Sequence, residues 1–240
     1  MTLPTTDGRL HGDGLTDVRM MISIHRVFRR ELGLLPASIR QVAAGDRRRV
    51  KILAAHLGLV AGGLHTHHTH EDEMMWPLLQ QRVPAELEPL VDLMEEQHER
   101  VADLGERVQQ HLAAWTASAA GSDGARLADA LDDLVAALCE HLDAEESRLL
   151  PIMARHIQPH EWADFAHAGE SSTPKNLRMV FLGMMLYEGD PATMATELAK
   201  MPAPVRAVVP RLARRAYRKY ATQVHGTPQP ARGVTVRAGV

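Results

Sequence analysis

The chain has 240 residues, 45% of them hydrophobic and 24% charged, which predicts one large folded domain or a domain with an appendage. Its single cysteine, Cys139, excludes an internal disulfide framework and a cysteine-type zinc or iron–sulfur site. No apolar run is long enough to form a transmembrane segment, and the polar N-terminus does not resemble a signal peptide. We therefore expect a cytoplasmic protein.

Three further features of the composition are informative. Aromatic residues make up only 4% of the chain, which favours a helical core of Leu, Val, Ala and Met over a sheet. The 14 histidines suggest metal binding, since histidine is the commonest metal ligand near neutral pH. The net charge of −3 is uneven: residues 198–240 carry nine basic and no acidic residues, so residues 1–197 have a net charge of −12.

Four long amphipathic helices are predicted, each with a seam of apolar residues spaced alternately by three and four, as in helix bundles. They cover roughly residues 16–35, 46–81, 84–115 and 125–156, with a small-residue linker at 118–124. Thr16 or Asp17 is the expected N-cap of the first helix. In the second helix the seam is predicted to continue through Met74 and Leu78.

Histidine and glutamate residues interrupt these apolar seams, one set in each helix: His25; His67 with Glu71; His98; and His141 with Glu145. The pattern is an internal repeat, because a lone histidine is followed after 42 or 43 residues by an HxxxE pair in both halves. A proline, Pro77 or Pro151, lies ten residues beyond each HxxxE histidine. The chain thus contains two copies of one helical hairpin.

This spacing predicts a metal site in the core of the bundle. Residues at i and i+4 lie on one helix face, so each HxxxE pair presents an imidazole and a carboxylate to a single point. Four imidazoles and two carboxylates suit iron, manganese or zinc better than calcium or magnesium. Six ligands are too many for one tetrahedral zinc ion and suit two ions that share the carboxylates.

Other polar residues near the second helix are interpreted as less central. His68 and Asp72 form a rival i,i+4 pair, but the phase of the seam favours His67 and Glu71. We expect the remaining histidines of the cluster to be exposed or to lie outside the ligand set: His65, His68 and His70. Three acidic residues could orient ligand imidazoles, although solvent is expected for most of them: Asp72, Glu73 and Glu146. Two histidines off the seams are expected at the surface, His56 and His111, and Cys139 is expected to be a buried, unreactive thiol.

Beyond Pro159 several shorter helices are predicted. Thr173–Pro174 and Asp190–Pro191 each resemble an N-cap followed by proline at the first helical position. A longer basic helix covers about 203–224 and ends at Gly226; its apolar side is predicted to be Val205, Val208, Val209, Leu212, Ala216, Tyr220 and Val224. Such helices can bind membranes or nucleic acid, but no nucleic-acid-binding motif is visible, and docking on the acidic bundle is favoured. Five residues of this region are candidates to approach the metal site: His160, His167, Tyr187, Tyr217 and Tyr220.

Four segments together resemble the hemerythrin-like HHE cation-binding domain family: ISIHRVFRREL, HTHHTHEDEMMWPLL, EEQHERV and EHLDAEESRLLPIM. The resemblance implies an all-α fold, an up-down-up-down four-helix bundle with a C-terminal helical extension. It also implies two non-haem iron ions with an oxo or hydroxo bridge, and the metal ligands His25, His67, Glu71, His98, His141 and Glu145. The expected organisation is a flexible N-terminus at 1–15, the bundle at 16–156, a helical extension packed on it at 157–226, and a flexible tail at 227–240.

The chain departs from the oxygen-carrying members of that family at two positions. Ala102 stands where they have a second histidine in the third helix, and Glu145 stands where they have aspartate. The site is therefore one imidazole short, which disfavours reversible oxygen carriage and leaves room for a ligand from outside the four motifs. The expected function is binding of, or reaction with, dioxygen, peroxide or nitric oxide, including a peroxide-decomposing or nitric-oxide-handling activity. The alternative is a non-catalytic sensor or iron store that signals through the basic extension; the sequence identifies no protein partner.

Overall fold

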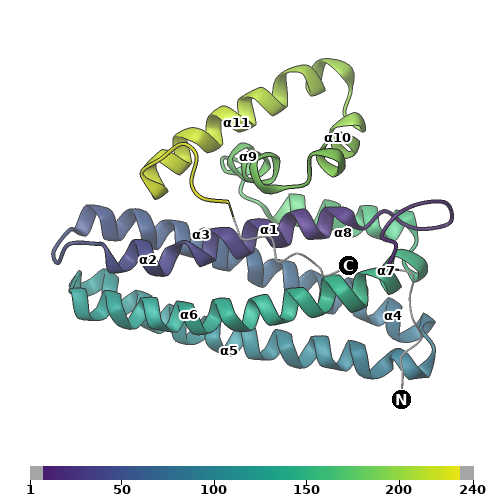
Figure 1. The fold of residues 1–240 in the computed structure, drawn as a ribbon, viewed down its shortest axis with the longest axis horizontal. Helices are drawn as coiled ribbons and strands as arrows, with labels where there is room; N and C mark the ends of the chain where they lie inside the picture. The colour runs from purple at the N-terminus through teal and green to yellow at the C-terminus, as the bar shows by residue number, and fades with distance from the viewer. Residues whose placement is uncertain (1–7, 233–240) are drawn as a thin grey trace.

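The computed structural model describes residues 8–232, which are helical and contain no strand (Figure 1). A π-helical segment joins α3 to α4 at Glu71–Met75 and another joins α6 to α7 at Glu145–Leu149, while a 3-10 turn at Ala85–Leu87 precedes α5. The α-helices are α1 (Arg19–Gly33), α2 (Leu35–Arg40), α3 (Arg47–His70), α4 (Trp76–Arg82), α5 (Glu88–Ser118), α6 (Gly121–Ala144), α7 (Leu150–His156), α8 (Pro159–Ser172), α9 (Arg178–Glu188), α10 (Pro191–Ala199) and α11 (Ala203–His225).

The four predicted long helices correspond to four arms that lie side by side along the long axis in Figure 1. These arms are α1 with α2, α3 with α4, α5, and α6 with α7. The first arm begins at Arg19, and its N-cap is Val18 rather than either predicted residue. Thr16 instead donates a hydrogen bond to the Ile157 carbonyl oxygen (2.6 Å), and Asp17 pairs with the Arg19 side chain (2.7 Å). Thr16 is thus committed to another partner, whereas Asp17 also accepts the backbone N–H of Arg19, the first residue of α1 (3.2 Å).

The fourth arm begins earlier than predicted, at Gly121 instead of about residue 125. Ala119 makes the turn from α5 with a left-handed φ of 54°. Gly124 then packs directly on Trp115, since a Cβ atom at Gly124 would lie 2.9 Å from the indole Nε1. The small residues of the predicted linker therefore serve close helix packing.

The bundle contains two apolar cores, one on each side of the layer that holds the histidine and glutamate residues. Met21, Met75 and Met94 belong to the core near the α4–α7 end, whereas Phe28 and Leu64 belong to the core near α2. Along α1 the order is Met21, His25, Phe28, so the polar layer separates the two cores within a single helix. The polar side chains are consequently enclosed by apolar packing at both ends.

The first π-helical segment shifts the buried seam of the second arm away from the predicted residues. The Trp76 N–H donates to the Glu71 carbonyl, five residues back, and the extra residue rotates the following helix. Met75 and Leu79 are buried as a result, while the predicted seam residues Met74 and Leu78 are only half-buried. The fourth arm has the same device, where the Leu150 N–H donates to the Glu145 carbonyl.

The prolines of the repeat lie directly after these π turns. Pro77 and Pro151 are each the second residue of the helix that follows, α4 and α7. Proline lacks an N–H and its ring clashes with the carbonyl four residues earlier, which an unbroken α-helix would have to accommodate. A π turn just before the proline removes this conflict, so the shared proline register matches a shared backbone irregularity.

Helices α9, α10 and α11 form a second layer beside α1 (Figure 1). Asp190 caps α10 as predicted, accepting from the Thr193 N–H (2.8 Å). Thr173 is instead the C-cap of α8, and Pro174 opens a turn before α9, so the prediction of an N-cap there was wrong. α11 ends at Gly226 as predicted, with a left-handed φ of 73°.

The buried side of α11 differs from the predicted apolar side. Ala213, Tyr217, Ala221 and Val224 are buried, because they face α9 and the bundle. Of the predicted residues, Val224 is buried and Tyr220 and Ala216 are half-buried. The first half of the helix rises away from the bundle in Figure 1, and three predicted residues there are exposed: Val205, Val208 and Leu212.

The predicted flexible ends are only partly described. Within residues 8–15 the Leu10 carbonyl accepts from the Val18 N–H (3.1 Å), and within residues 227–232 the Pro230 carbonyl accepts from the Tyr187 hydroxyl (2.7 Å). Residues 1–7 and 233–240 lie outside the described range. Across residues 8–232, none of the helices combines the length and apolar character that crossing a membrane requires.

Replacing Gly183 by alanine tests the close packing of α9 on α11. A Cβ at Gly183 would overlap the Ala213 carbonyl oxygen and lie 2.5 Å from the Tyr217 Cβ. We expect Gly183→Ala to lower the free energy of unfolding by about 1–3 kcal/mol in urea denaturation, because the helices must separate. The matched control is Gly169→Ala in α8, where the Cβ meets nothing within 4 Å and alanine favours the helix. Equal effects of both substitutions would contradict the close packing.

Candidate metal centre

All six residues predicted as metal ligands are buried in the polar layer of the bundle. Four of them are 0% exposed: His25, Glu71, His141 and Glu145. His98 is 5% exposed and His67 is 8% exposed. They come from all four arms, as the sequence predicted. The structure therefore brings the predicted set together in one layer.

The imidazoles form two pairs. His25 Nε2 lies 3.2 Å from His67 Nε2, and His98 Nε2 lies 3.2 Å from His141 Nε2. Ligand atoms bound to one ion at about 2.1 Å lie roughly 3.0–3.4 Å apart when the bond angles are 90–110°. Each pair thus has the spacing of two neighbouring ligands of one ion.

The two carboxylates each face both imidazole pairs. Glu71 Oε1 lies 3.3 Å from His67 Nε2, and its Oε2 lies 3.6 Å from His98 Nε2. Glu145 Oε2 lies 3.3 Å from His25 Nε2 and 3.7 Å from His141 Nε2. This arrangement places both glutamates between the two pairs.

The carboxyl and imidazole groups of this layer favour a bound cation. None of the four carboxylate oxygens of Glu71 and Glu145 accepts a hydrogen bond from residues 8–232. Burial, and then the charge of Glu145, raise the pKa of Glu71 well above its ordinary value, and burial also raises the pKa of Glu145. Burial lowers the pKa of His67 well below its ordinary value and that of His141 to about 2, so these imidazoles are neutral. The buried carboxyl groups therefore favour either a bound proton or a bound metal ion, and the inward imidazole lone pairs beside them fit a metal ion.

The outward nitrogens of three imidazoles are held by hydrogen bonds. His25 Nδ1 donates to Glu146 Oε1 (3.0 Å), His98 Nδ1 to Asp72 Oδ1 (2.7 Å), and His141 Nδ1 to Gln97 Oε1 (3.3 Å). These bonds keep the proton on Nδ1 and aim the Nε2 lone pair inward. Asp72 and Glu146 each orient an imidazole, one of the two roles expected for them; Asp72 does so while its side chain remains 45% exposed, and Glu73 is exposed. Gln97 was not predicted.

The orienting carboxylates connect the two halves of the repeat. Asp72 directly follows Glu71 in the first half and holds His98 of the second. Glu146 directly follows Glu145 in the second half and holds His25 of the first. An acidic residue after each HxxxE glutamate was the sequence signal for this role. Arg29 in turn donates to Glu146 and to Asp143 Oδ1 (2.7 Å), which fixes the α1–α6 contact.

Comparison with known proteins agrees with this geometry. The family model for the hemerythrin HHE cation-binding domain matches residues 16–161, more than half of the chain. The chain belongs to the hemerythrin HHE cation-binding domain family. No curated protein and no solved structure matches it significantly. The match ends within α8, so most of the C-terminal layer lies outside the hemerythrin domain.

His68 is buried beside the candidate metal centre. The sequence predicted that it would be either exposed or outside the ligand set. The residue is 6% exposed, and its ring stacks on His98 with centroids 4.1 Å apart. It also meets His141 edge-on at 5.0 Å, and its Nε2 has no hydrogen-bond partner among residues 8–232. Ligand atoms of these three histidines lie within 4.8 Å of one another. His68 thus brings a fifth imidazole beside the centre, while His65 on the same helix is exposed.

Three aromatic rings cover the hemerythrin centre. Phe28 and Phe165 lie 5.4 and 6.2 Å from the His67 ring, and Trp76 lies 5.7 Å from the His98 ring. Phe165 is on α8, beyond the end of the family match, and is buried. Phe165 was not predicted, because an isolated aromatic residue in a short helix carries no distinctive pattern.

Several other histidine, cysteine and tyrosine residues lie outside this layer. His56 is buried, so its expected surface position was wrong; it contacts Tyr220 between the bundle and α11. Cys139 is half-buried, and burial raises the pKa of its thiol. The candidates from the extension are not in the centre: His160 and His167 are exposed, while Tyr187, Tyr217 and Tyr220 lie in the α9–α11 layer.

Removing an orienting carboxylate tests its role in metal binding. We expect Asp72→Ala to weaken metal binding by about 10–100-fold, because His98 loses the acceptor that fixes its proton and its ring. Equilibrium competition with a chelator measures the affinity. Glu73→Ala, an exposed neighbour on the same helical turn, should leave the affinity unchanged. Equal affinities of the two variants would show that the Asp72 contact does not act on the metal.

Proposed function

We propose that the protein is a non-haem di-iron protein whose two ions share the carboxylates of Glu71 and Glu145. The observation that carries the proposal is that the two oxygens of Glu71 face different imidazole pairs, at 3.3 and 3.6 Å. One ion would be held by His25 and His67, and the other by His98 and His141. Mixed imidazole and carboxylate ligands with more than four donors favour iron over tetrahedral zinc. The four arms would then form the up-down-up-down bundle of the family.

In this proposal His68 is a further ligand on the side of His98 and His141. Its support is burial, an Nε2 without a hydrogen-bond partner among the described residues, and a ring nitrogen within 4.8 Å of ligand atoms of those two residues. It would supply the fifth imidazole that the sequence lacks at Ala102. The two ions would then differ, one with three imidazoles and one with two, which leaves the poorer ion for an external molecule.

The site fits a small ligand: dioxygen, peroxide or nitric oxide. Paired iron ions supply one- and two-electron chemistry when bound. The chain's own residues hold the centre dry and fixed: Phe28, Trp76 and Phe165 cover the imidazoles, and Asp72 and Glu146 keep protons on the outward Nδ1 atoms. Such an apolar cover excludes water and favours small, weakly solvated molecules.

A second candidate function is a sensor or iron store without turnover. The observation that favours it is the contact between Phe165 of α8 and His67, together with the packing of the C-terminal layer on α1, which carries His25. A displacement of His67 would reach the extension through Phe165, and a displacement of His25 would reach it through α1.

Metal loading tests the di-iron proposal. After anaerobic loading we expect about two iron ions per chain by elemental analysis, because six or seven donors can satisfy two ions. His67→Ala should lose at least one iron, and His68→Ala should weaken the ion on the His98 side by about tenfold or more while the other stays bound.

His65→Ala is the control for these variants, because His65 is exposed on the same helix. It should bind two irons like the unaltered chain. One tightly held zinc ion with no second metal under any loading would contradict the proposal. Full iron binding by His68→Ala would remove His68 from the ligand set.

Turnover separates the two candidate functions. A reactive centre should consume hydrogen peroxide or nitric oxide catalytically in the iron-loaded protein, and the rate should fall with iron content in His67→Ala. A sensor should show no turnover but a ligand-dependent change in the rate at which trypsin cleaves α11, whose arginines are exposed. Catalytic consumption with an unchanged cleavage pattern would exclude the sensor.

A further inference from the structure

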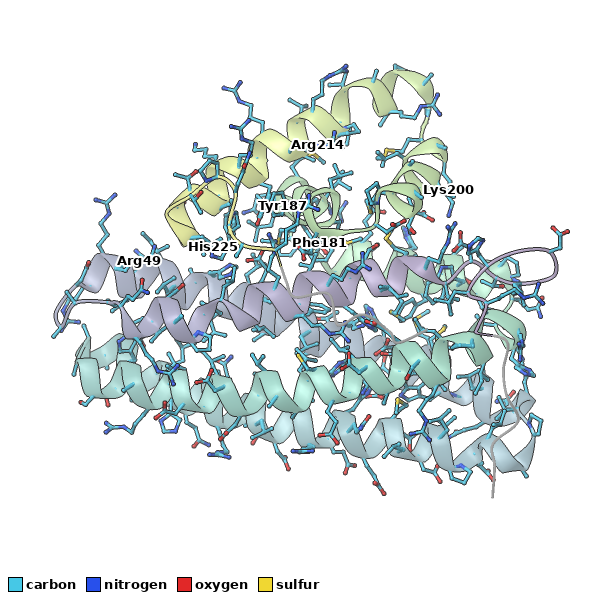
Figure 2. The ribbon with its side chains drawn as sticks, viewed as in Figure 1. Arg49, Phe181, Tyr187, Lys200, Arg214 and His225 are labelled. Carbon is cyan, nitrogen blue, oxygen red and sulfur yellow. The ribbon has the colours of Figure 1, made fainter. Side chains whose placement is uncertain are left out.

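A second buried polar cluster lies where α11 meets the bundle, outside the hemerythrin centre. Its members are Glu31 of α1, His56 of α3 and His225, the last residue of α11. Figure 2 shows His225 at the end of α11 that approaches the bundle. Glu31 is 0% and His56 1% exposed, and the His225 side chain is 5% exposed. Three separate helices thus deliver these groups to one water-excluded point.

The two imidazoles converge on one carboxylate oxygen. Glu31 Oε2 lies 2.9 Å from His225 Nε2 and 3.3 Å from His56 Nε2. The two rings meet edge-on, with centroids 5.4 Å apart. All three ligand atoms lie within 4.8 Å of one another, which is the spacing of donors around a single ion.

One nitrogen in this cluster has no hydrogen bond. His56 Nε2 is buried and has no hydrogen-bond partner among the described residues, although it faces Glu31. The other nitrogen, Nδ1, lies 3.0 Å from the Tyr220 hydroxyl, which can accept its proton. A histidine that donates through Nδ1 presents an Nε2 lone pair, the form in which imidazole binds a metal.

The remaining groups fix the carboxylate in this orientation. Glu31 Oε1 accepts from Arg30 and from the Tyr217 hydroxyl (3.3 Å), which leaves Oε2 for the histidines. Burial by itself raises the pKa of the Glu31 carboxyl, but the neighbouring His225, His56 and Arg30 outweigh burial and lower this pKa far below its ordinary value, so the group is a carboxylate. Arg30 Nε also lies 3.6 Å from Glu188 Oε2, so this guanidinium is shared between two carboxylates.

The end of α11 is positioned independently of the cluster. Arg49 of α3 donates to the carbonyl oxygens of Gln223 (2.9 Å) and Val224 (2.5 Å). These carbonyls belong to the last turn of α11, where acceptors are unsatisfied within the helix. His225 is therefore brought to Glu31 even without a bond between them, and the cluster is preorganised.

We propose that Glu31, His56 and His225 form a second metal site, which binds one zinc ion and ties α11 to α1 and α3. Two imidazoles and one carboxylate are a ligand set that zinc uses, with one position left for a non-protein ligand. Glu31 follows His25 by six residues, about 9 Å along α1, so this site shares no ligand with the di-iron centre. The zinc ion neutralises the buried carboxylate and fastens the C-terminal layer.

Zinc binding to the iron-loaded protein tests this site. We expect one zinc ion per chain beyond the iron, by elemental analysis after equilibration with zinc and removal of excess, with the iron content unchanged. His225→Ala should weaken zinc binding at least tenfold and keep the iron, whereas His225→Cys, which restores a zinc ligand, should recover binding. His167→Ala, an exposed histidine of α8, is the control and should bind zinc fully.

Zinc should also slow tryptic cleavage at Arg218 and Lys219 in the unaltered chain and not in His225→Ala, because only the former is fastened. Should circular dichroism show that His225→Ala is unfolded, the unaltered iron-loaded protein decides the matter with cobalt(II) as the probe. One equivalent should then give the visible absorption of four-coordinate cobalt. Absence of that absorption, zinc that only displaces iron, or full zinc binding by a folded His225→Ala would each overturn the site.

Discussion

Two buried carboxylates that face each other in an apolar bundle are the constraint on which the rest of the structure depends. Glu71 and Glu145 have no hydrogen-bond donors among the described residues. Burial raises the pKa of both, and the charge of Glu145 raises the pKa of Glu71 further. Burial of such a pair is strongly unfavourable unless cations join them. The surrounding features follow from this requirement: neutral imidazoles turned inward, apolar cores on both sides, and aromatic rings that keep water out.

Each half of the internal repeat supplies its own buried glutamate and histidines, and hydrogen bonds link the two halves. Each half supplies a lone histidine, an HxxxE pair, a π turn at the glutamate and a proline behind it. The acidic residue after each glutamate reaches across to the lone histidine of the other half, Asp72 to His98 and Glu146 to His25. Neither half can orient its own lone histidine, so the bundle must assemble completely before the centre is ordered.

The sequence predicted the four arms and the burial of the six candidate metal ligands, because both follow from the regular spacing of residues along a helix face. It failed where the period breaks or where long-range packing decides. A π turn at Glu71 shifts Met74 and Leu78 off the core, and no propensity marks such a turn in advance. His56 was expected at the surface because its partners, Tyr220 and His225, come more than 160 residues later. Val208 and Leu212 were predicted on the buried side of α11 but are exposed, for the same reason: packing against α9 determines which side of α11 is buried.

Phe165 places a residue of the C-terminal region beside the centre without being a metal ligand. The ring belongs to α8, beyond the matched hemerythrin domain, yet lies against His67. In the proposed di-iron centre the extension would act on the metal environment through the local dielectric constant and not through coordination. Lifting α8 would leave every donor in place while raising the polarity around His67, and it would shift the redox potential of bound metal. The part of the chain that would hold the metal and the part that would tune it are thus separate segments of sequence.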